Sequence, residues 1–235
     1  MFKNYGYKFN REKCWYLNKC EHADNPEVCQ ISCVRYFKMD YLMYCSNIPK
    51  KSQGFEKVTK RKGDEKVFDD LVKLKKDLLN WVNQGNNLYL WSEGFGNGKT
   101  SWALKLLKNY FNLIWPTTDF VCRGLFISIP VFMRAYKDQF KKQDEYFDFL
   151  LENIPEADIV VWDDVGYASV SDADFKILSS FIEERYLNEK SNIFTGNLNR
   201  DELITQLGKR MTSRIWDKSE HLEFKSSDFR GFTER

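Results

Sequence analysis

The stretch WSEGFGNGKTSW, residues 91–102, constrains the fold of this 235-residue chain more than any other. It follows the apolar run NNLYLW and precedes an amphipathic run, so it predicts a strand, a glycine-rich loop and a helix in that order. A loop of the pattern G-x-x-x-x-G-K-[ST] wraps phosphates with backbone N–H groups, while its Lys reaches the terminal phosphates and its Ser or Thr ligates Mg²⁺. Gly98, Lys99 and Thr100 match that pattern. The sequence therefore predicts a nucleotide site.

Glu93 stands where this pattern begins with glycine. Gly94 and Gly96 still provide positions without a Cβ, so the turn can take positive φ angles. A helix beginning near Gly98 also points its positive end at a bound anion. We expect the Glu93 carboxylate to point to solvent and the loop to bind ATP, the alternative being a loop that has lost this ability. The predicted binding residues are Gly94, Phe95, Gly96, Asn97, Gly98, Lys99, Thr100 and Ser101.

Short apolar runs alternate with amphipathic stretches along the rest of the chain. The expected strands are 86–91, 124–129, 157–162 and 192–197, with 221–225 as a fifth. The expected helices are 68–85, a helix after Lys99, 131–140, 146–154 and 175–188. Strands that alternate with helices are typical of an α/β fold with a parallel sheet and right-handed crossovers.

Two carboxylates, Asp163 and Asp164, end the apolar run IVVWDD. In a parallel sheet this position lies at the carboxyl edge, where ligands bind. We expect Asp163 to hold Mg²⁺, directly or through water, and Asp164 to orient or deprotonate the attacking water. Paired acids after a strand are more often a turn, and it is the upstream loop that favours a site. Lys99, Asp163 and Asp164 then form the predicted catalytic set.

Five of the six cysteines lie within the first 45 residues, at the spacing C-x5-C-x8-C-x3-C-x11-C, and Cys122 lies alone downstream. Such clustering in a chain without an export signal favours a metal over disulfides, and thiolates suit Zn²⁺ or an iron–sulfur cluster. A structural zinc takes four N or S ligands. The predicted ligands are Cys14, Cys20, Cys29 and Cys33, with His22 and Cys45 as substitutes. The alternative is a set of small buried thiols.

Composition divides the chain into a Cys-rich module at residues 1–48, a basic linker at 49–66 and a larger domain at 67–235. Residues 1–66 carry 14 Lys and Arg against 8 Asp and Glu, whereas the remainder carries 22 against 26. The linker is therefore either a solvated tether or a basic strap along nucleic acid. The strap would use Lys57, Lys60, Arg61 and Lys62.

The chain shows no sign of membrane insertion or export. Nowhere do 18 apolar residues run together, so the sequence predicts no membrane span. The start MFKNYGYKFNREK is polar and lacks the apolar stretch of a signal peptide. We expect a cytoplasmic protein.

Four stretches taken in order, GFGNGKT, VVWDDVG, FTGNL and MTSRIWD, resemble the AAA+ ATPases of the helicase-loader group. This group includes loaders of the DnaC and DnaI type, their phage counterparts and the IstB transposition helpers. The resemblance covers roughly residues 65–235. It implies a P-loop AAA+ domain with a three-layer parallel-sheet fold and no helical lid, which hydrolyses ATP with Mg²⁺.

The resemblance also implies roles for single residues. Asn197, at a strand end, would be the polar sensor that positions the hydrolytic water. Arg214 would be the finger that reaches a neighbouring subunit's γ-phosphate, which implies self-association through Arg214. Arg230, in SSDFRG, would sense nucleotide within its own chain. Asp164 stands where many AAA+ proteins carry Glu, so with Glu93 it implies slow hydrolysis.

As a member of this group, the chain would load a replicative hexameric helicase onto single-stranded DNA at the start of replication, in a phage or prophage setting. Residues 1–48 would then be the module that grips the helicase. One alternative is an IstB-like helper that remodels DNA for a transposase. Another is an adaptor without hydrolysis, in which nucleotide is a structural ligand.

Overall fold

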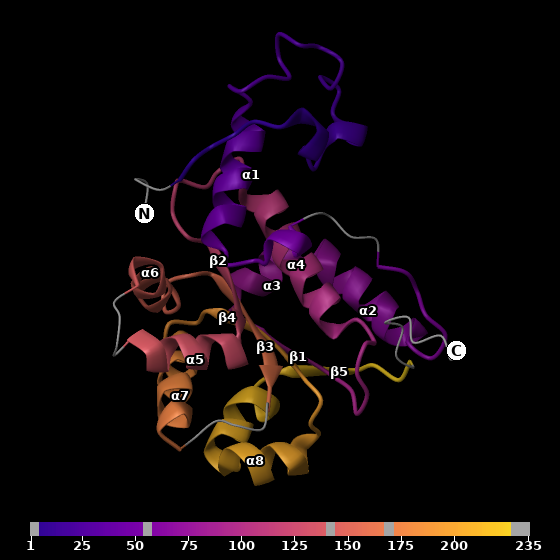
Figure 1. Ribbon diagram of the computed structural model, residues 1–235. Coiled ribbons are helices and arrows are strands. Elements are labelled where there is room, and N and C mark those ends of the chain that lie inside the picture. Colours follow the sequence, from indigo (N-terminus) through magenta and orange to yellow (C-terminus); the bar gives the residue numbers. More distant parts are fainter. Residues whose placement is uncertain (1–4, 54–57, 140–143, 167–171, 227–235) are drawn as a thin grey trace, which may run out of the picture.

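The computed structural model describes residues 5–53, 58–139, 144–166 and 172–226. Five strands alternate with helices along the chain (Figure 1). The strands are β1 (Asn87–Trp91), β2 (Gly124–Ser128), β3 (Ile159–Val165), β4 (Ser191–Gly196) and β5 (Glu220–Glu223). The α-helices are α1 (Val34–Cys45), α2 (Glu65–Lys76), α3 (Leu78–Asn83), α4 (Lys99–Ile114), α5 (Ile129–Gln139), α6 (Glu145–Asn153), α7 (Asp172–Leu187) and α8 (Arg200–Thr212). Short helical turns are η2 (Arg11–Lys13), η3 (Leu17–Lys19), η4 (Lys50–Ser52) and the π-helical η5 (Ser213–Asp217).

The five strands form one parallel sheet in the order β2-β3-β4-β1-β5. Strand β4 is buried along its whole length and β1 at every residue except Trp91, as expected for a parallel sheet covered on both faces. In this order β4 lies between β1 and β3, which are far apart in the sequence. The loops that follow β1, β3 and β4 therefore meet at one stretch of the carboxyl edge.

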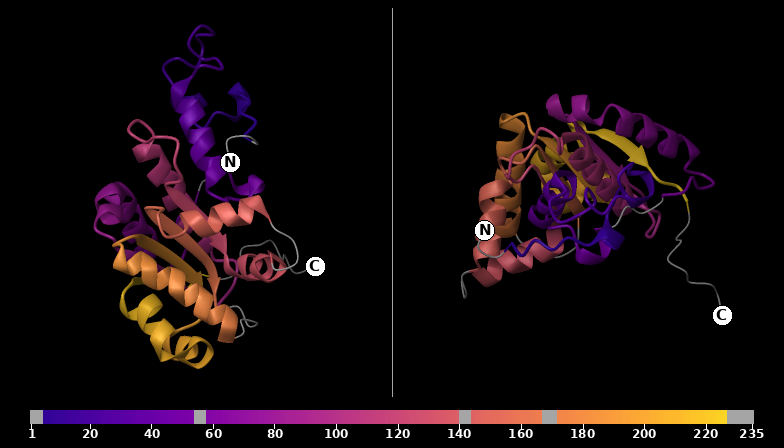
Figure 2. Two further views of the ribbon diagram at one scale, coloured as in Figure 1. Left: turned by 90° about the vertical axis from the view of Figure 1, so that its left-hand side faces the viewer. Right: turned by 90° about the horizontal axis from the view of Figure 1, so that it is seen from above.

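Helices cover both faces of the sheet and give three layers (Figures 1 and 2). On one face α1, α2, α3 and α4 pack against the sheet through one hydrophobic cluster. On the other face α5, α6, α7 and α8 pack against it through a second cluster. The predicted three-layer α/β fold is confirmed. Among the described residues after β5, up to Ser226, there is no further helix.

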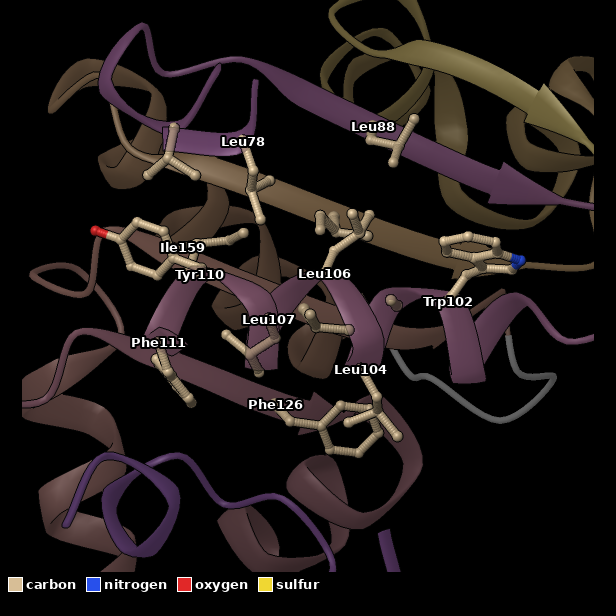
Figure 3. Close-up of a cluster of buried hydrophobic side chains, with 14 of the residues drawn as sticks. Leu78, Leu88, Trp102, Leu104, Leu106, Leu107, Tyr110, Phe111, Phe126 and Ile159 are labelled. Atoms are coloured by element: carbon tan, nitrogen blue, oxygen red, sulfur yellow. The ribbon is translucent and has the colours of Figure 1, made fainter. Parts of the chain in front are cut away.

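Helix α4 anchors the first of these clusters. Its leucine and aromatic side chains lie between Leu88 of β1 and Phe126 of β2 (Figure 3). Leu106 and Leu107 are wholly buried there. Removing such a side chain costs about 2–5 kcal/mol of stability. The cluster thus fixes the helix whose first turn carries the glycine-rich loop.

The start of the chain is not independent of this body. Met39, Leu42 and Met43 of α1 belong to the α4 cluster, and the N–H of Phe126 donates to the Ser46 carbonyl at 2.7 Å. Residues before α1 project away from the layers as turns and short helices (Figures 1 and 2). The division at 1–48, 49–66 and 67–235 stays a prediction, but α1 packs as part of the core.

The observed elements match the expected ones except at three places. Helix α1 was not predicted, because its residues were assigned to the Cys-rich module. The helix expected at 68–85 is split at Asp77, whose φ of −102° and ψ of 15° end α2 before α3 begins. Helix α8 was not predicted, although Asn199 caps it through a capping box with Glu202. None of the helices in the described part of the chain has the length and apolar character that a bilayer crossing requires.

A buried arginine connects several elements on the face of the sheet that α5, α6, α7 and α8 cover. Arg185 of α7 is wholly buried, and its guanidinium donates to the carbonyls of Ile154 and Ala157 at 2.6 and 2.7 Å. It also donates to the Asn192 side chain at 2.8 Å. Burial lowers its pKa from the usual value to about 9. These acceptors hold the start of β4 against the segment before β3, and so fix the register that aligns the strand ends.

Candidate nucleotide-binding site

The glycine-rich loop lies where the sequence predicts it, between β1 and α4. Gly96 and Gly98 have φ angles of 69° and 98°, a region that residues with a Cβ rarely adopt. Glu93 is exposed, so its carboxylate stands in solvent rather than in the loop. The loop backbone therefore keeps the phosphate-wrapping form without glycine at its first position.

Lys99, the first residue of α4, is 8% exposed and its ammonium lies inside the loop. It donates to Ser92 Oγ at 2.5 Å, to the Gly94 carbonyl at 3.0 Å and to Asn97 Oδ1 at 3.0 Å. These acceptors are neutral. Phosphate oxygens at this place would carry negative charge, so they would be stronger partners for the same ammonium.

The two predicted magnesium ligands, Thr100 and Asp163, touch each other. Thr100 Oγ1 donates to Asp163 Oδ1 at 2.8 Å, and Thr195 Oγ1 of β4 donates to the same oxygen at 2.7 Å. The hydroxyl of Thr100 and the carboxylate of Asp163, 63 residues apart, thus meet at one point. Both are oxygen ligands of the kind that Mg²⁺ takes in proteins. Thr195 was not predicted, although it lies in the FTGNL stretch.

The pKa of Asp163 is raised, first by burial and also by the charge of Asp164. The hydrogen bonds from Thr195 and Thr100, and the charge of Lys99, lower it but do not outweigh burial. The buried charge is therefore unfavourable where it stands. A divalent cation beside it would relieve that cost.

Asp164 breaks the regular strand. Its φ of 63° is in the left-handed region, and the register between β3 and β4 shifts between Trp162 and Val165. The bulge turns the Asp164 side chain out to an exposed position, while its N–H donates to Thr195 Oγ1 at 3.1 Å. Backbone strain of this kind is typical of functional sites. The exposed carboxylate faces the same cavity as the loop.

Asn197 follows β4 and lies at the same edge. Its Oδ1 is buried and has no hydrogen-bond partner among the described residues. The backbone around it is fixed by Tyr89, whose hydroxyl donates to the Leu198 carbonyl at 2.9 Å. Tyr89 also fills the space where a Cβ on Gly196 would stand. A buried acceptor held in this way is suited to orient a water or a ligand donor.

These groups surround one cavity of about 460 Å³. Phe95, Gly96, Asn97, Gly98, Lys99, Thr100, Ser101, Asp164 and Asn197 line it, together with Arg61. Arg61 was predicted only as part of a linker or strap. No signal in the sequence places it here, because it precedes the loop by more than 30 residues and belongs to no motif.

The remaining predicted arginines lie elsewhere. The guanidinium of Arg214, in η5, forms an ion pair with Glu183 of α7 and donates to the Arg210 carbonyl at 3.4 Å. Burial raises the pKa of Glu183, but the hydrogen bond and charge of Arg214, together with Arg210, outweigh it and lower that pKa. Arg214 does not line the cavity. Arg230 lies outside the described residues.

The predicted metal group of the first segment is not confirmed. In the ranges that the structure describes, no three His, Cys, Asp or Glu side chains are grouped so that they could hold a metal ion. Cys14, Cys20, Cys29 and Cys33 are half-buried, in or next to short turns. The four thiols lie near one another. Burial is the main cause that raises the pKa of Cys14, and the charges of the other three thiols raise it further. Neighbourhood alone is not coordination, since zinc needs four ligands converging at about 2.3 Å.

The two substitute ligands do not complete such a group either. Cys45 is wrong as a ligand, because it is 1% exposed and belongs to the second hydrophobic cluster with Cys122. Burial raises its pKa to about 11, which keeps the thiol protonated and unsuited to a metal. His22 is exposed in the loop after η3.

Solved structures show the same fold. The crystal structure of the DnaC helicase loader aligns with a TM-score of 0.61 at 21% identity, over 75% of this chain and 100% of that one. The crystal structure of DnaI aligns with a TM-score of 0.59 at 15% identity, over 80% and 99%. AMPPCP-bound DnaA from Aquifex aeolicus aligns with a TM-score of 0.57 at 17% identity, over 73% of this chain but only 49% of that one.

No protein-family model matches the chain, and no curated protein matches it. At these identities the structural likeness is one of fold. The predicted resemblance to the DnaC and DnaI type is confirmed at that level. This chain has a parallel five-stranded α/β fold, and in this fold it resembles the DnaC helicase loader, DnaI and DnaA.

Proposed function

We propose that this protein is an ATP-dependent loader that places a hexameric replicative helicase on single-stranded DNA. The observation that carries the proposal is the carboxyl edge of the sheet, where the glycine-rich loop, Asp164 and Asn197 surround one cavity. Asp163 lies beside it, hydrogen-bonded to Thr100 of the cavity lining. This cavity lies in a fold shared with DnaC and DnaI along three quarters or more of the chain.

In this proposal the loop residues hold the phosphates of ATP, and Lys99 exchanges its neutral acceptors for phosphate oxygens. Thr100 and Asp163 would hold Mg²⁺, which neutralises charge on the phosphates. The buried Asp163 carboxylate and the unpartnered Asn197 oxygen are the features of this chain that fit such ligands. The catalytic effect is positioning and charge stabilisation, as in other phosphoryl transfers.

Hydrolysis then needs a base and an aligned water. Asp164 is exposed to the cavity and would accept a proton from the water, whose oxygen attacks the γ-phosphorus while the bond to ADP breaks. Asn197 would orient this water through its amide. ADP and phosphate are the products. The short Asp164 side chain agrees with a slow switch rather than a fast motor.

Arg214 enters this scheme between subunits. Because it does not line the cavity of its own chain, it would act on the γ-phosphate of a neighbour. It must first leave the ion pair with Glu183. Hydrolysis would then be coupled to assembly, which suits a protein that must act only beside its helicase.

In this proposal the helicase docks on the projecting first segment. Val28, Ile31 and Val34 are 44%, 64% and 58% exposed. Three apolar side chains exposed within seven residues are suited to docking on a partner. In this proposal the helicase is gripped by residues 28–34, which end at the first residue of α1, and the core-packed remainder of α1 is not involved.

The test is the mass in solution of the purified protein mixed with its host's replicative helicase, with and without ATP. We expect a complex of defined stoichiometry. Removal of residues 1–48 would also remove α1 from the core, so point variants are the sharper choice. Ile31→Asp should abolish the complex, whereas Leu187→Asp, at a site 79% exposed on α7, should leave it intact.

Either other result would change the proposal. Assembly on duplex DNA driven by ATP, with no helicase complex, would favour a transposition helper. A helicase complex that forms equally well without nucleotide, and without hydrolysis, would favour an adaptor.

A further inference from the structure

We propose that Arg61 is a phosphate ligand of the nucleotide, acting in the same chain as the loop. This rests on the proposed nucleotide site and adds to it a residue that no motif predicts. The short segment 58–64 passes beside the glycine-rich loop and carries Arg61 into the cavity.

The segment 58–64 is held in place on both sides of Arg61. Asp64 is 4% exposed, and its carboxylate accepts from the N–H groups of Lys225 and Ser226 at 2.6 and 3.0 Å. Lys60 turns the other way and forms an ion pair with Asp69 of α2 at 2.7 Å. With its neighbours held in this manner, Arg61 is directed to the loop by the backbone.

Its guanidinium lies against the loop itself. Arg61 Nη1 donates to the Gly96 carbonyl at 3.3 Å. A Cβ added to Gly98 would lie 3.7–3.9 Å from Nη1, Cζ and Nη2 of Arg61, so the whole guanidinium group faces that glycine. Gly96 and Gly98 are the positions whose positive φ angles shape the phosphate cradle. The guanidinium therefore stands at the place where phosphate oxygens bind.

The charge of the site favours this role. Lys99 is the cation that the motif supplies, while Asp163 and Asp164 add two negative charges to the same edge. A second cation offsets part of this charge, and a guanidinium can donate to two phosphate oxygens at once. A 3.3 Å bond to a neutral carbonyl is a long contact by comparison.

The experiment compares Arg61→Gln with Lys62→Gln, which removes the same charge from the next, exposed position. Competition against a fluorescent ATP analogue gives the affinities of ATP and of inorganic triphosphate, which has no base. Thermal melting without nucleotide gives the stability of each variant. We expect Arg61→Gln to weaken the binding of both ligands roughly 10- to 100-fold. Lys62→Gln should bind both ligands as the unmodified protein does. The two variants should have equal melting temperatures.

Three outcomes would overturn this assignment. If Arg61→Gln binds as Lys62→Gln does, the guanidinium contributes nothing. If Arg61→Gln weakens the binding of ATP but not that of inorganic triphosphate, Arg61 contacts the base or ribose. If Arg61→Gln melts clearly lower as it loses affinity, Arg61 only holds the loop. In all three the unmodified protein still binds ATP, whereas failure of the unmodified protein to bind would remove the proposed function itself.

Discussion

Two regions in the described part of this molecule carry dense sets of reactive side chains, and they differ in how closely those side chains converge. At the carboxyl edge of the sheet, Lys99 and Thr100 of α4 and Asn197 after β4 line one cavity. Asp163 of β3 accepts a hydrogen bond from Thr100 beside it. In the projecting first segment, four thiols lie in one neighbourhood without forming a metal-holding group. Both sets were predicted from spacing.

The difference lies in what fixes each backbone. Paired parallel strands hold the first set, with a bulge beside Asp164, and buried residues such as Tyr89 and Arg185 hold the strands. The second set lies on turns and 3-10 helices of three residues each, none of which has a buried residue. A motif therefore predicts geometry when a sheet enforces it, and spacing in turns does not.

The largest effect should come from the residue that needs a second subunit. Arg214→Ala should lower hydrolysis in the assembled protein roughly 10³-fold, because a finger stabilises charge in the transition state. Nucleotide binding by single chains should not change. Phosphate release measures the hydrolysis rate, and equilibrium binding measures the nucleotide affinity.

Glu183→Gln is the matched variant, because it frees Arg214 from its ion pair. It should keep or raise hydrolysis on assembly. Equal losses in both variants would mean that the ion pair merely holds α7 to η5.

Asp164→Asn comes next. It should lower hydrolysis roughly 10²-fold while ATP affinity stays the same, since a positioned base typically contributes that much. Single-turnover phosphate release and competition binding separate the two. Unchanged turnover would show that another group takes the proton, and unchanged helicase loading without turnover would favour the adaptor.

Asp163→Asn should change the thermal stability of the protein in a pH-dependent way. The raised pKa of Asp163 means that its contribution to stability is present below the unfolded pKa and lost as pH rises through the folded value. In the nucleotide-free protein, Asn should therefore raise the melting temperature at neutral pH, with the gain disappearing toward pH 4. The exposed Asp201→Asn is the control. A gain that is the same at every pH would contradict the assignment to this carboxyl.

The smallest effect is expected in the first segment. Cys29→Ser, at a half-buried position in a turn, should change the free energy of unfolding by about 0.5 kcal/mol or less. Chemical denaturation measures it, and metal analysis of the purified protein accompanies it. A loss of several kcal/mol together with one zinc per chain would mean that a metal draws the four turns together.

Much of the fold could be predicted from sequence, for a physical reason. Apolar runs of strand length between amphipathic runs leave few alternatives to a parallel sheet, and all five strands lie where their runs predict them. The helix break at Asp77 and the cap of α8 at Asn199 are local features that weak propensities do not resolve.

The sequence by itself determined the chemistry of the site: a loop with glycines where φ is positive, a lysine, and carboxylates at a strand end. These are local patterns, each read within a few residues. Only the tertiary structure decided that Thr195 shares Asp163 with Thr100, that Arg61 faces Gly98, and that Arg185 and Cys45 are buried. Such contacts join residues many positions apart, and their partners are chosen by strand order and packing, which no local pattern records.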